Sequence, residues 1–288
     1  MNNPRVAELV GLLQVEQLEH NLFRGASGDV GSPAVFGGQV LGQAVMAAGR
    51  TVQGRSLHSL HAYFLRPGDK HAPIVYEVDR IRDGGSFTTR RVVAVQHGQA
   101  IFGFAASFHA PEPGPSHHAA MPDVPPPEAL LDMAQLRLQR PGHAQEPHRV
   151  PLHDDMPVEI RPVEVVHPYR PEPHPPWAHW WMRAADRLPD DPLLHQAMLA
   201  YASDFGFVRT AMLPHALSFY QSNVQAVSLD HAMWFHGDFR FDEWMLHATD
   251  SPAAQAARGF VRGSLFTADG RLVASAAQEG LMRLKRPR

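Results

Sequence analysis

The sequence lacks cysteine, a strong excess of charge of either sign and any long hydrophobic run. The absence of cysteine excludes disulfides, thiolate metal sites, iron–sulfur clusters and a cysteine nucleophile. Lys and Arg number 26 and Asp and Glu 29, so the net charge of −3 gives no general attraction to nucleic acid or to an anionic membrane. The longest apolar stretch, from Val35 to Gly49, contains two glutamines and several glycines, and we expect no membrane span. The 288 residues, 44% of them hydrophobic, predict a globular, cytoplasmic protein without a nucleic-acid partner.

Several common catalytic motifs are also missing. No G-x-S-x-G is present, which argues against a serine nucleophile on a strand–helix turn. Gly37 and Gly42 have the spacing of a phosphate-binding loop, but Gln43-Ala44 replaces the required Lys-Ser/Thr, and no G-x-G-x-x-G follows a predicted strand. The eight histidines between His117 and His179 have no metal-ligand spacing. We therefore predict neither a metal nor a cofactor.

Proline divides the chain into two parts. Of 26 prolines, 17 lie between Pro111 and Pro176, a density that disfavours long helices and central strands. We predict a Pro-rich connection over 112–152, ordered or flexible, with one short helix within Glu128–Leu138. It separates a unit at 1–111, which begins with a helix, from a second unit at 153–288.

The two units have the same order of elements. In the first, a predicted helix (Phe36–Ala48) precedes four predicted strands: Ser59–Arg66, Ile74–Asp83, Ser86–His97 and Ala100–His109. In the second, Asp191 caps a predicted helix that begins at Pro192, and strands are predicted at Ala226–His236, Glu243–Thr249, Ala257–Thr267 and Arg271–Leu284.

Local similarities support a duplication. Gly98 and Gly270 occupy matching hairpin turns, and His61-Ala62-Tyr63-Phe64 matches His231-Ala232-Met233-Trp234 at an offset of 170. We predict an α+β fold made of two tandem copies, each a central helix wrapped by an antiparallel sheet. The two sheets are expected to join edge to edge into one continuous sheet.

Three polar residues lie in apolar surroundings of the second unit. Asp204 is near the end of the helix, where an unpaired carboxylate is costly, although it is also placed to cap a turn. Gln278 shares the face of alanines in the last strand, as a core glutamine or a functional one, and Ser228 begins a strand and alone says little. Alignment of the two units places Ala47 opposite Asp204 and Ala106 opposite Gln278. Shared packing does not require this asymmetry, whereas a single active site does.

At these residues the sequence resembles the acyl-CoA thioesterase II family, whose members have two hotdog folds in one chain. The resemblance covers nearly the whole chain, with the matching strings in the family's order. The strings are Asn21-Leu22-Phe23-Arg24-Gly25, Phe36-Gly37-Gly38-Gln39-Val40, His61-Ala62-Tyr63-Phe64-Leu65-Arg66-Pro67-Gly68, Arg161-Pro162-Val163-Glu164, Tyr201-Ala202-Ser203-Asp204, Asp230-His231-Ala232-Met233-Trp234-Phe235-His236 and Ala257-Arg258-Gly259-Phe260-Val261. The resemblance implies a double hotdog, with one hotdog at 1–111 and the other at 153–288.

The resemblance also implies an activity, the hydrolysis of fatty acyl-CoA to fatty acid and CoA without a covalent intermediate. The family's catalytic aspartate, hydroxyl residue and glutamine fall on Asp204, Ser228 and Gln278. Double hotdogs commonly associate, so a homo-oligomer, either a dimer or a tetramer, is expected. Eukaryotic relatives often end in a peroxisomal targeting tripeptide, whereas this sequence ends Arg286-Pro287-Arg288.

Further substrate contacts are predicted from residue type. Gly37 and Gly38 are candidates for oxyanion binding through their backbone N–H groups, although their alternative role is tight helix packing. Arg66 is a candidate for binding CoA phosphates, and the other arginines considered are Arg90, Arg91, Arg258 and Arg262. Candidates for the lining of an acyl tunnel are Phe36, Leu65, Met198 and Trp234, which are equally compatible with a plain core.

Two other functions remain open at the level of sequence. Asp190-Asp191-Pro192-Leu193-Leu194-His195 resembles the signature of hotdog enoyl-CoA hydratases, in which an Asp and a His activate water. Here Pro192 comes one position early and the signature's Asn is missing, and helix capping by Asp191 explains the string without catalysis. The second alternative is a non-catalytic acyl-CoA binding protein, against which the complete set of three polar residues argues.

Overall fold

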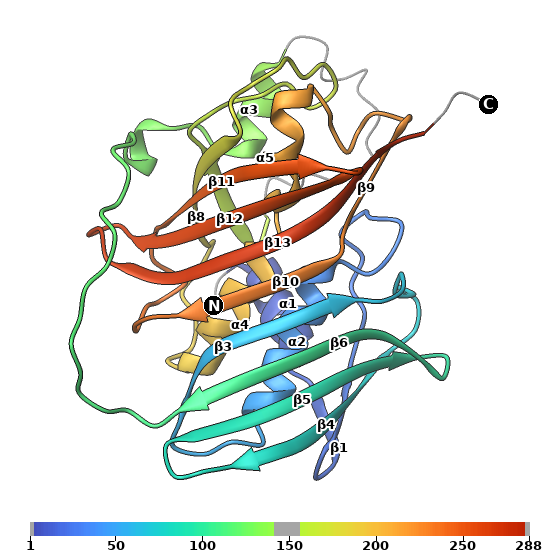
Figure 1. Cartoon of the computed structure of the whole chain (residues 1–288), viewed down its shortest axis with the longest axis vertical. Coiled ribbons are helices and arrows are strands. Elements are labelled where there is room, and N and C mark those ends of the chain that lie inside the picture. Colours follow the sequence, from blue (N-terminus) through green and yellow to red (C-terminus); the bar gives the residue numbers. More distant parts are fainter. Residues whose placement is uncertain (1–2, 141–155, 286–288) are drawn as a thin grey trace.

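Two apolar helices form the centre of the structure, a computed structural model that describes residues 3–140 and 156–285. Every residue of α2 (Gly37–Gly49) after Gly37 is buried, so the helix is packed on all sides. Helix α4 (Pro192–Ser203) begins as predicted, because the Asp191 carboxylate accepts a hydrogen bond from the Leu193 N–H at 3.0 Å. In Figure 1 both helices lie behind one large sheet.

The helices α2 and α4 pack against each other in antiparallel directions. A Cβ atom at Gly38 would collide with the Tyr201 carbonyl oxygen, and one at Gly42 would lie 3.0 Å from that of Ala197. Glycine therefore permits a close approach of the two backbones. This packing places the beginning of α2 beside the end of α4.

The first repeat consists of two helices and six strands. They are α1 (Pro4–Leu13), β1 (Glu16–Glu19), β2 (Leu22–Gly25), α2, β3 (Ser56–Phe64), β4 (Ile74–Asp83), β5 (Phe87–Gln96) and β6 (Gln99–His109). The connection contains the 3₁₀ turn η1 (Pro127–Ala129) and α3 (Met133–Gln139). The second repeat contains β7 (Val158–Pro162), β8 (Trp177–Ala184), α4, α5 (Phe207–Met212), the 3₁₀ turn η3 (Leu213–His215), β9 (Val224–Ser228), β10 (Asp230–Phe235), β11 (Met245–Gln255), β12 (Arg258–Thr267) and β13 (Leu272–Leu284).

Within the described residues, thirteen strands form one sheet, and all of their pairings are antiparallel. The order is β1-β2-β4-β5-β6-β3-β10-β13-β12-β11-β8-β7, with β9 paired to β13. Read from the β3–β10 junction outward, the two halves have matching orders, as a twofold relation between two copies requires. The predicted α+β double hotdog with a continuous sheet is thus confirmed.

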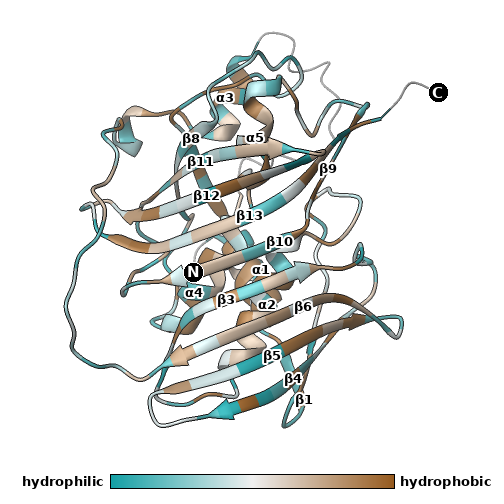
Figure 2. Ribbon diagram, in the orientation of Figure 1, coloured by the Kyte–Doolittle hydropathy of each residue, from teal (hydrophilic) through white to brown (hydrophobic). Residues whose placement is uncertain are grey.

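The sheet is half buried, with its inner face on the helices. Along β5 the buried residues alternate with more exposed ones, and Figure 2 shows the corresponding alternation of hydrophobic and hydrophilic residues along the strands. One cluster of buried hydrophobic residues extends through both repeats, from Val6 in α1 to Ala276 in β13. None of the helices in the described ranges is long and apolar enough to cross a membrane.

The predicted hairpins are confirmed, since Gly98 (φ +72°) and Gly270 (φ +90°) both have the left-handed conformation at their turns. The single strand predicted over Ala226–His236 is wrong, because it is two strands, β9 and β10. The break occurs at Asp230, whose carboxylate accepts a hydrogen bond from the Glu279 N–H at 2.6 Å. In a continuous ladder this N–H would instead donate to a backbone carbonyl of the neighbouring strand. Beyond this point β10 lies between β13 and β3, whereas among the described strands β9 pairs with β13 alone.

The sequence match of His61–Phe64 to His231–Trp234 differs by one residue from the structural alignment of the two strands. His61 is exposed, whereas His231 is fully buried, so the two histidines lie on opposite faces of the sheet. In β3 the buried Leu60 pairs with Ala106, and in β10 it is His231 that is hydrogen-bonded to Gln278. Leu60 is therefore the structural counterpart of His231, as Ala106 is that of Gln278.

The described part of the connection is packed on the second repeat. In Figure 1 the chain runs from the end of β6 along one side of the sheet to the other repeat. There the Trp181 indole donates to the Pro125 carbonyl at 2.9 Å, and Met121 and Val124 pack on the outer face of β8, β11 and β12. Helix α3 lies where the short helix was predicted. The predicted end of the connection at residue 152 lies outside the described residues.

Candidate active site

The structure brings together Asp204, Ser228 and Gln278, three residues far apart in sequence. The Gln278 amide nitrogen donates to Asp204 Oδ1 at 2.7 Å, and the Ser228 hydroxyl donates to the same oxygen at 3.3 Å. The Asp204 side chain is 4% exposed and Gln278 is 1% exposed. A carboxylate so shielded from water is stabilised by these donors.

Each of these side chains is positioned by the end or the middle of a regular element. Asp204 is the residue that ends α4, with φ −79° and ψ −12°. Ser228 is the last residue of β9, and Gln278 lies on the buried face of β13, as the alternation of its neighbours predicted. Ser228 pairs with Gly280 across the β9–β13 ladder, so the backbone fixes the hydroxyl near Gln278.

The first repeat completes the cluster. A Cβ atom at Gly37 would lie 2.8 Å from Asp204 Oδ2 and 2.8 Å from a ring carbon of Phe64, so the carboxylate closely approaches the first turn of α2. Neither Gly37 nor Gly38 has a bound N–H among the described backbone contacts, as is normal at a helix start. Gly38 is also required for the close contact between the helices.

Two residues of the cluster were not predicted, His231 and Ser203. His231 is fully buried, with Nδ1 3.1 Å from the Gln278 amide nitrogen and 4.0 Å from Asp204 Oδ1. Its Nε2 lies 3.0 Å from the Ser203 hydroxyl. Burial lowers the pKa of His231 to about 4, although the nearby Asp204 carboxylate opposes this shift. Strand alternation with Met233 and Phe235 was the signal that places His231 inside.

Four of the five candidate arginines for CoA binding form ion pairs with carboxylates of the protein. Arg90 is buried and donates to Asp83, and the exposed Arg91, Arg258 and Arg262 pair with Asp79, Glu279 and Asp250. Arg66 is exposed and donates to the Ala100 carbonyl at 2.6 Å. No contact in the described chain joins Arg66 to Asp204, but it lies two residues beyond Phe64.

Of the predicted lining residues, only Phe36 lies beside the cluster. Its ring stacks on Phe205, the residue after Asp204, with centroids 4.6 Å apart, and meets Tyr201 edge to face at 5.2 Å. The other three occupy different places: Leu65 is exposed, Met198 belongs to the central core, and Trp234 packs on His61 at the outer face of the sheet.

The residues of the hydratase-like signature bind elsewhere. The exposed Asp190 pairs with Arg240 at 2.5 Å, while Nδ1 of the buried His195 accepts the Phe241 N–H at 2.9 Å. Asp191 caps α4, as the structural explanation of this string predicted. The sequence Asp190–His195 therefore supports the fold through its own contacts.

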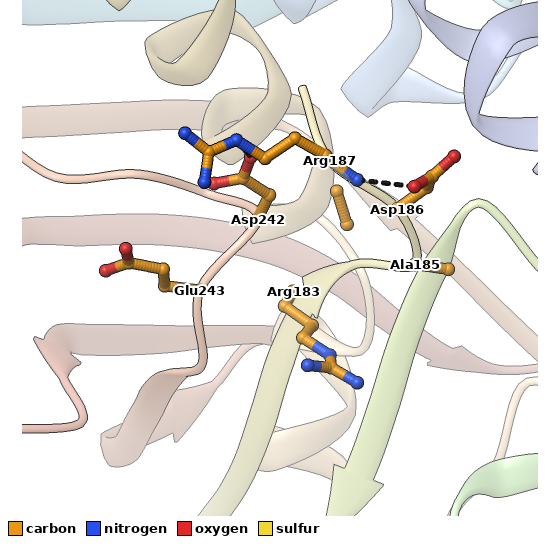
Figure 3. Close-up of a pocket in the computed structure, with 7 residues that line it drawn as sticks. Arg183, Ala185, Asp186, Arg187, Asp242 and Glu243 are labelled. Carbon is orange, nitrogen blue, oxygen red and sulfur yellow. Dashed lines mark hydrogen bonds and ion pairs between the residues drawn. The ribbon is translucent and has the colours of Figure 1, made fainter. Parts of the chain in front are cut away.

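A separate surface cavity of about 240 Å³ lies at the end of β8 (Figure 3). It is lined by Arg183, Ala184, Ala185, Asp186, Arg187, Asp242 and Glu243. Its arginines have carboxylate partners: Arg183 pairs with Glu159 at 2.9 Å, and Arg187 reaches Asp242 at 3.5 Å. Both lining arginines are thus already paired with carboxylates, and none of the lining residues belongs to the Asp204 cluster.

The arrangement around Asp204 is suited to proton transfer. A buried carboxylate with one oxygen held by two donors can accept a proton from a bound water, and the free N–H groups at the start of α2 can stabilise a developing negative charge. No group of three or more potential metal ligands occurs in the part of the chain that the structure describes.

The fold and this cluster define a double-hotdog protein with an acid, amide and hydroxyl site between its two repeats. Comparison with known families agrees: an acyl-CoA thioesterase model matches residues 151–281, and an acyl-CoA thioesterase N-terminal domain model matches residues 25–109. The chain is 42% identical to human acyl-coenzyme A thioesterase 8 over 284 residues, 95% of this chain and 88% of that protein. It is 39% identical to acyl-CoA thioesterase 2 of Haemophilus influenzae over 277 residues, 96% of each chain.

Solved structures give the same result. The crystal structure of the acyl-CoA thioesterase II TesB2 from Mycobacterium marinum is similar with a TM-score of 0.78 at 42% identity, covering 96% of this chain and 98% of that one. The chain therefore belongs to the acyl-CoA thioesterase II family.

Proposed function

We propose that this protein hydrolyses fatty acyl-CoA to a free fatty acid and CoA through a water molecule activated by Asp204. The observation that carries the proposal is the buried cluster in which Ser228 and Gln278 both donate to Asp204 Oδ1. The counterparts of Asp204 and Gln278 in the aligned first repeat are Ala47 and Ala106, so the polar set is specific to one copy. The names of the relatives, all acyl-CoA thioesterases, supply the substrate class.

In the proposed reaction, Asp204 is the general base. The water oxygen attacks the thioester carbonyl carbon while one water proton moves to the carboxylate, and Ser228 and Gln278 orient the water. The resulting tetrahedral intermediate expels the CoA sulfur as the C–S bond breaks, and the proton returns to that sulfur. Water supplies the new oxygen of the fatty acid, so the step needs no covalent enzyme intermediate.

Gly37 and Gly38 are proposed to stabilise the oxyanion of this intermediate. Their N–H groups are at the start of α2, where backbone donors and the helix dipole both favour negative charge. Removal of one such donor costs about 10²- to 10³-fold in other enzymes. The close approach of Asp204 Oδ2 to Gly37 supports this proposal, because the proposed base and the proposed donors are then neighbours.

The remainder of the substrate is proposed to bind nearby. Arg66 is the proposed contact for a CoA phosphate, because it forms no ion pair with a carboxylate among the described contacts. Phe36, stacked on Phe205, is proposed to contact the acyl chain. We further propose a homo-oligomer, a dimer or a tetramer, in the cytoplasm. Light scattering on the purified protein measures the oligomeric state, and fractionation of the native cells measures the location.

The test is thiol release from a panel of acyl-CoAs, from C4 to C18, by the wild type and by Asp204→Asn. Because the chain has no cysteine, every thiol detected is CoA. We expect turnover by the wild type and a loss of about 10²- to 10⁴-fold in the variant. Asp230→Asn is the matched control, since the Asp230 carboxylate binds the Glu279 N–H instead of the cluster.

The outcomes separate the alternatives. Asp204→Asn with near wild-type activity would leave the thioesterase function in place but remove Asp204 as its base. Acyl-CoA binding without thiol release at any chain length would favour a binding protein. Hydration of an enoyl-CoA that is lost in His195→Ala would favour the hydratase.

A further inference from the structure

His231 lies directly behind the proposed catalytic glutamine, and no role follows for it from the proposed reaction. It has no exposed surface, and its two ring nitrogens contact different partners: Gln278 Nε2 at 3.1 Å and the Ser203 hydroxyl at 3.0 Å. The Ser203 hydroxyl donates in turn to the Ala200 carbonyl at 2.9 Å, with Met233 Sδ a weaker acceptor at 3.3 Å.

These contacts determine which group donates and which accepts in the series of hydrogen bonds from Ala200 through Ser203, His231 and Gln278 to Asp204. A backbone carbonyl only accepts, so the Ser203 proton points to Ala200 and its oxygen accepts from His231 Nε2–H. Nδ1 is then unprotonated and accepts one N–H of Gln278, while the other Gln278 N–H goes to Asp204 Oδ1. The reverse amide orientation would place the Gln278 oxygen 2.7 Å from a carboxylate oxygen.

We propose that His231, held by Ser203 as the Nε2–H tautomer, is a positioning residue that fixes the carboxamide of Gln278 for catalysis. The proposal rests on the proposed function, because it assigns His231 a role only through Gln278. With both amide protons committed, the acceptor Gln278 Oε1 remains, and it has no protein partner among the described residues although it is buried. Oε1 is thus the group left to accept a hydrogen bond from the attacking water, whose other proton moves to Asp204.

The other repeat shows that packing alone does not require this histidine. Its counterpart there is Leu60, which is fully buried and pairs with Ala106, the counterpart of Gln278. An apolar side chain therefore fills the same place in the fold where no glutamine needs an acceptor. At this position, histidine occurs in the copy that contains the polar cluster and leucine in the other, although a buried imidazole is costly without hydrogen bonds.

The surroundings of His231 favour its neutral form. The titratable groups near it are Asp204 from the end of α4 and His247 from β11. The ring of Phe207 from α5 packs on both histidines, with centroids 5.6 Å from His231 and 5.3 Å from His247. Burial outweighs the attraction of Asp204, so at neutral pH the ring keeps the acceptor that Gln278 requires.

The first test compares substitutions of two buried histidines. His231→Leu removes the acceptor with little change in volume, and we expect kcat to fall about 10- to 100-fold with little change in KM. His231→Asn, whose amide oxygen can replace Nδ1, should restore part of kcat. His247→Leu is the matched control, because His247 also packs on Phe207 but has no hydrogen bond to the cluster. Equal kcat values for wild type and His231→Leu would overturn the proposal.

The second test is a double-mutant cycle. If His231 acts only through Gln278, then His231→Leu should change kcat less than about twofold in a Gln278→Ala background. Full additivity of the two losses would contradict the positioning role. An inactive Asp204→Asn with an unaffected His231→Leu would reject the inference and retain the proposed function, whereas an active Gln278→Ala would reject the proposed role of Gln278 itself.

A third variant covers the case in which His231→Leu does not fold. Ser203→Ala removes only the acceptor of the Nε2–H and leaves the imidazole in place. We expect kcat to fall about 3- to 10-fold, because the tautomer with a protonated Nδ1 then faces the Gln278 N–H. An unchanged kcat in correctly folded Ser203→Ala would count against the proposal.

Discussion

Two fully buried histidines of the second repeat make the stability of the protein depend on pH. Burial lowers the pKa of His231 to about 4 and that of His247 to about 3. In the unfolded chain both have a pKa of about 6.5, so the unfolded state binds these protons first as the pH falls. The stability that the neutral rings contribute above pH 6.5 is thus progressively lost as the pH falls toward 3 to 4.

We expect the free energy of unfolding to fall by about 2 kcal/mol between pH 6 and pH 5 from these two residues together. Urea unfolding at a series of pH values measures it. His247→Leu should remove about half of the slope. A slope that is the same in His247→Leu would show that this ring is protonated equally in both states.

The residues of the site differ in how far the sequence predicts them. Asp204 and Gln278 could be selected because a charge or an amide among alanines is costly, and because the other repeat has alanine there. His231 was missed because the visible match of His61-Ala62 to His231-Ala232 assigns it to the wrong face. A shift of one residue in a strand reverses inside and outside, and only the paired strands fix that register.

At the scale of elements, the start of α2 has two adjacent glycines with different constraints. A Cβ atom at Gly38 would collide with the backbone carbonyl of Tyr201, which the antiparallel helix α4 holds in place. A Cβ atom at Gly37 would lie 2.8 Å from two side chains, those of Asp204 and Phe64, which can shift. A side chain at position 38 therefore strains the packing of α2 on α4, and a side chain at position 37 displaces the proposed base, Asp204.

We expect Gly38→Ala to destabilise the protein by about 3 kcal/mol or more, since neither backbone can move without the sheet. Gly37→Ala should cost about 1 kcal/mol or less but lower kcat at least about 10-fold, by displacing the Asp204 carboxylate. Thermal unfolding and thiol release on both variants separate these effects. The reverse order, with Gly37→Ala the less stable and Gly38→Ala the less active, would refute this assignment.

Elements at the margins of the sheet were the hardest to predict. Strand β7 ends with Pro162 and β8 follows Pro175-Pro176, and the density of proline argued against strands there. Because β7 is at the edge of the sheet, its proline leaves no ladder bond missing on the open side.

Helix α5 has only six residues, too few for a periodic pattern, and it is positioned by contacts with β11 and β12.

At the scale of the whole molecule, the site depends on both repeats. Asp204, Ser228 and Gln278 belong to the second repeat. Gly37 belongs to the first, and the Asp204 carboxylate and the Phe64 ring, also of the first repeat, both lie next to Gly37. The repeats are joined by the β3–β10 ladder and by the packing of α2 on α4. Neither repeat alone contains all residues of the proposed site.

We expect fragments 1–114 and 115–288 to be inactive separately and active when co-expressed. Gly114 lies in an exposed part of the connection, so a break there removes no buried contact. Each fragment alone exposes a strand edge and one apolar helix face, which favours aggregation. Thiol release by the co-purified pair is the measurement. Activity of the isolated 115–288 fragment would contradict a requirement for the first repeat.

The antiparallel helices meet at a second junction, where the end of α2 lies beside the beginning of α4. There a Cβ atom at Gly49 would lie 2.5 Å from the Leu193 side chain, so an apolar contact occupies the place that corresponds to the acid cluster. In two separate identical subunits, both junctions would change together with every substitution. In a fused pair each junction can change independently. Here the junction at Gly37 holds the polar cluster, and the junction at Gly49 is an apolar contact that joins the two helices.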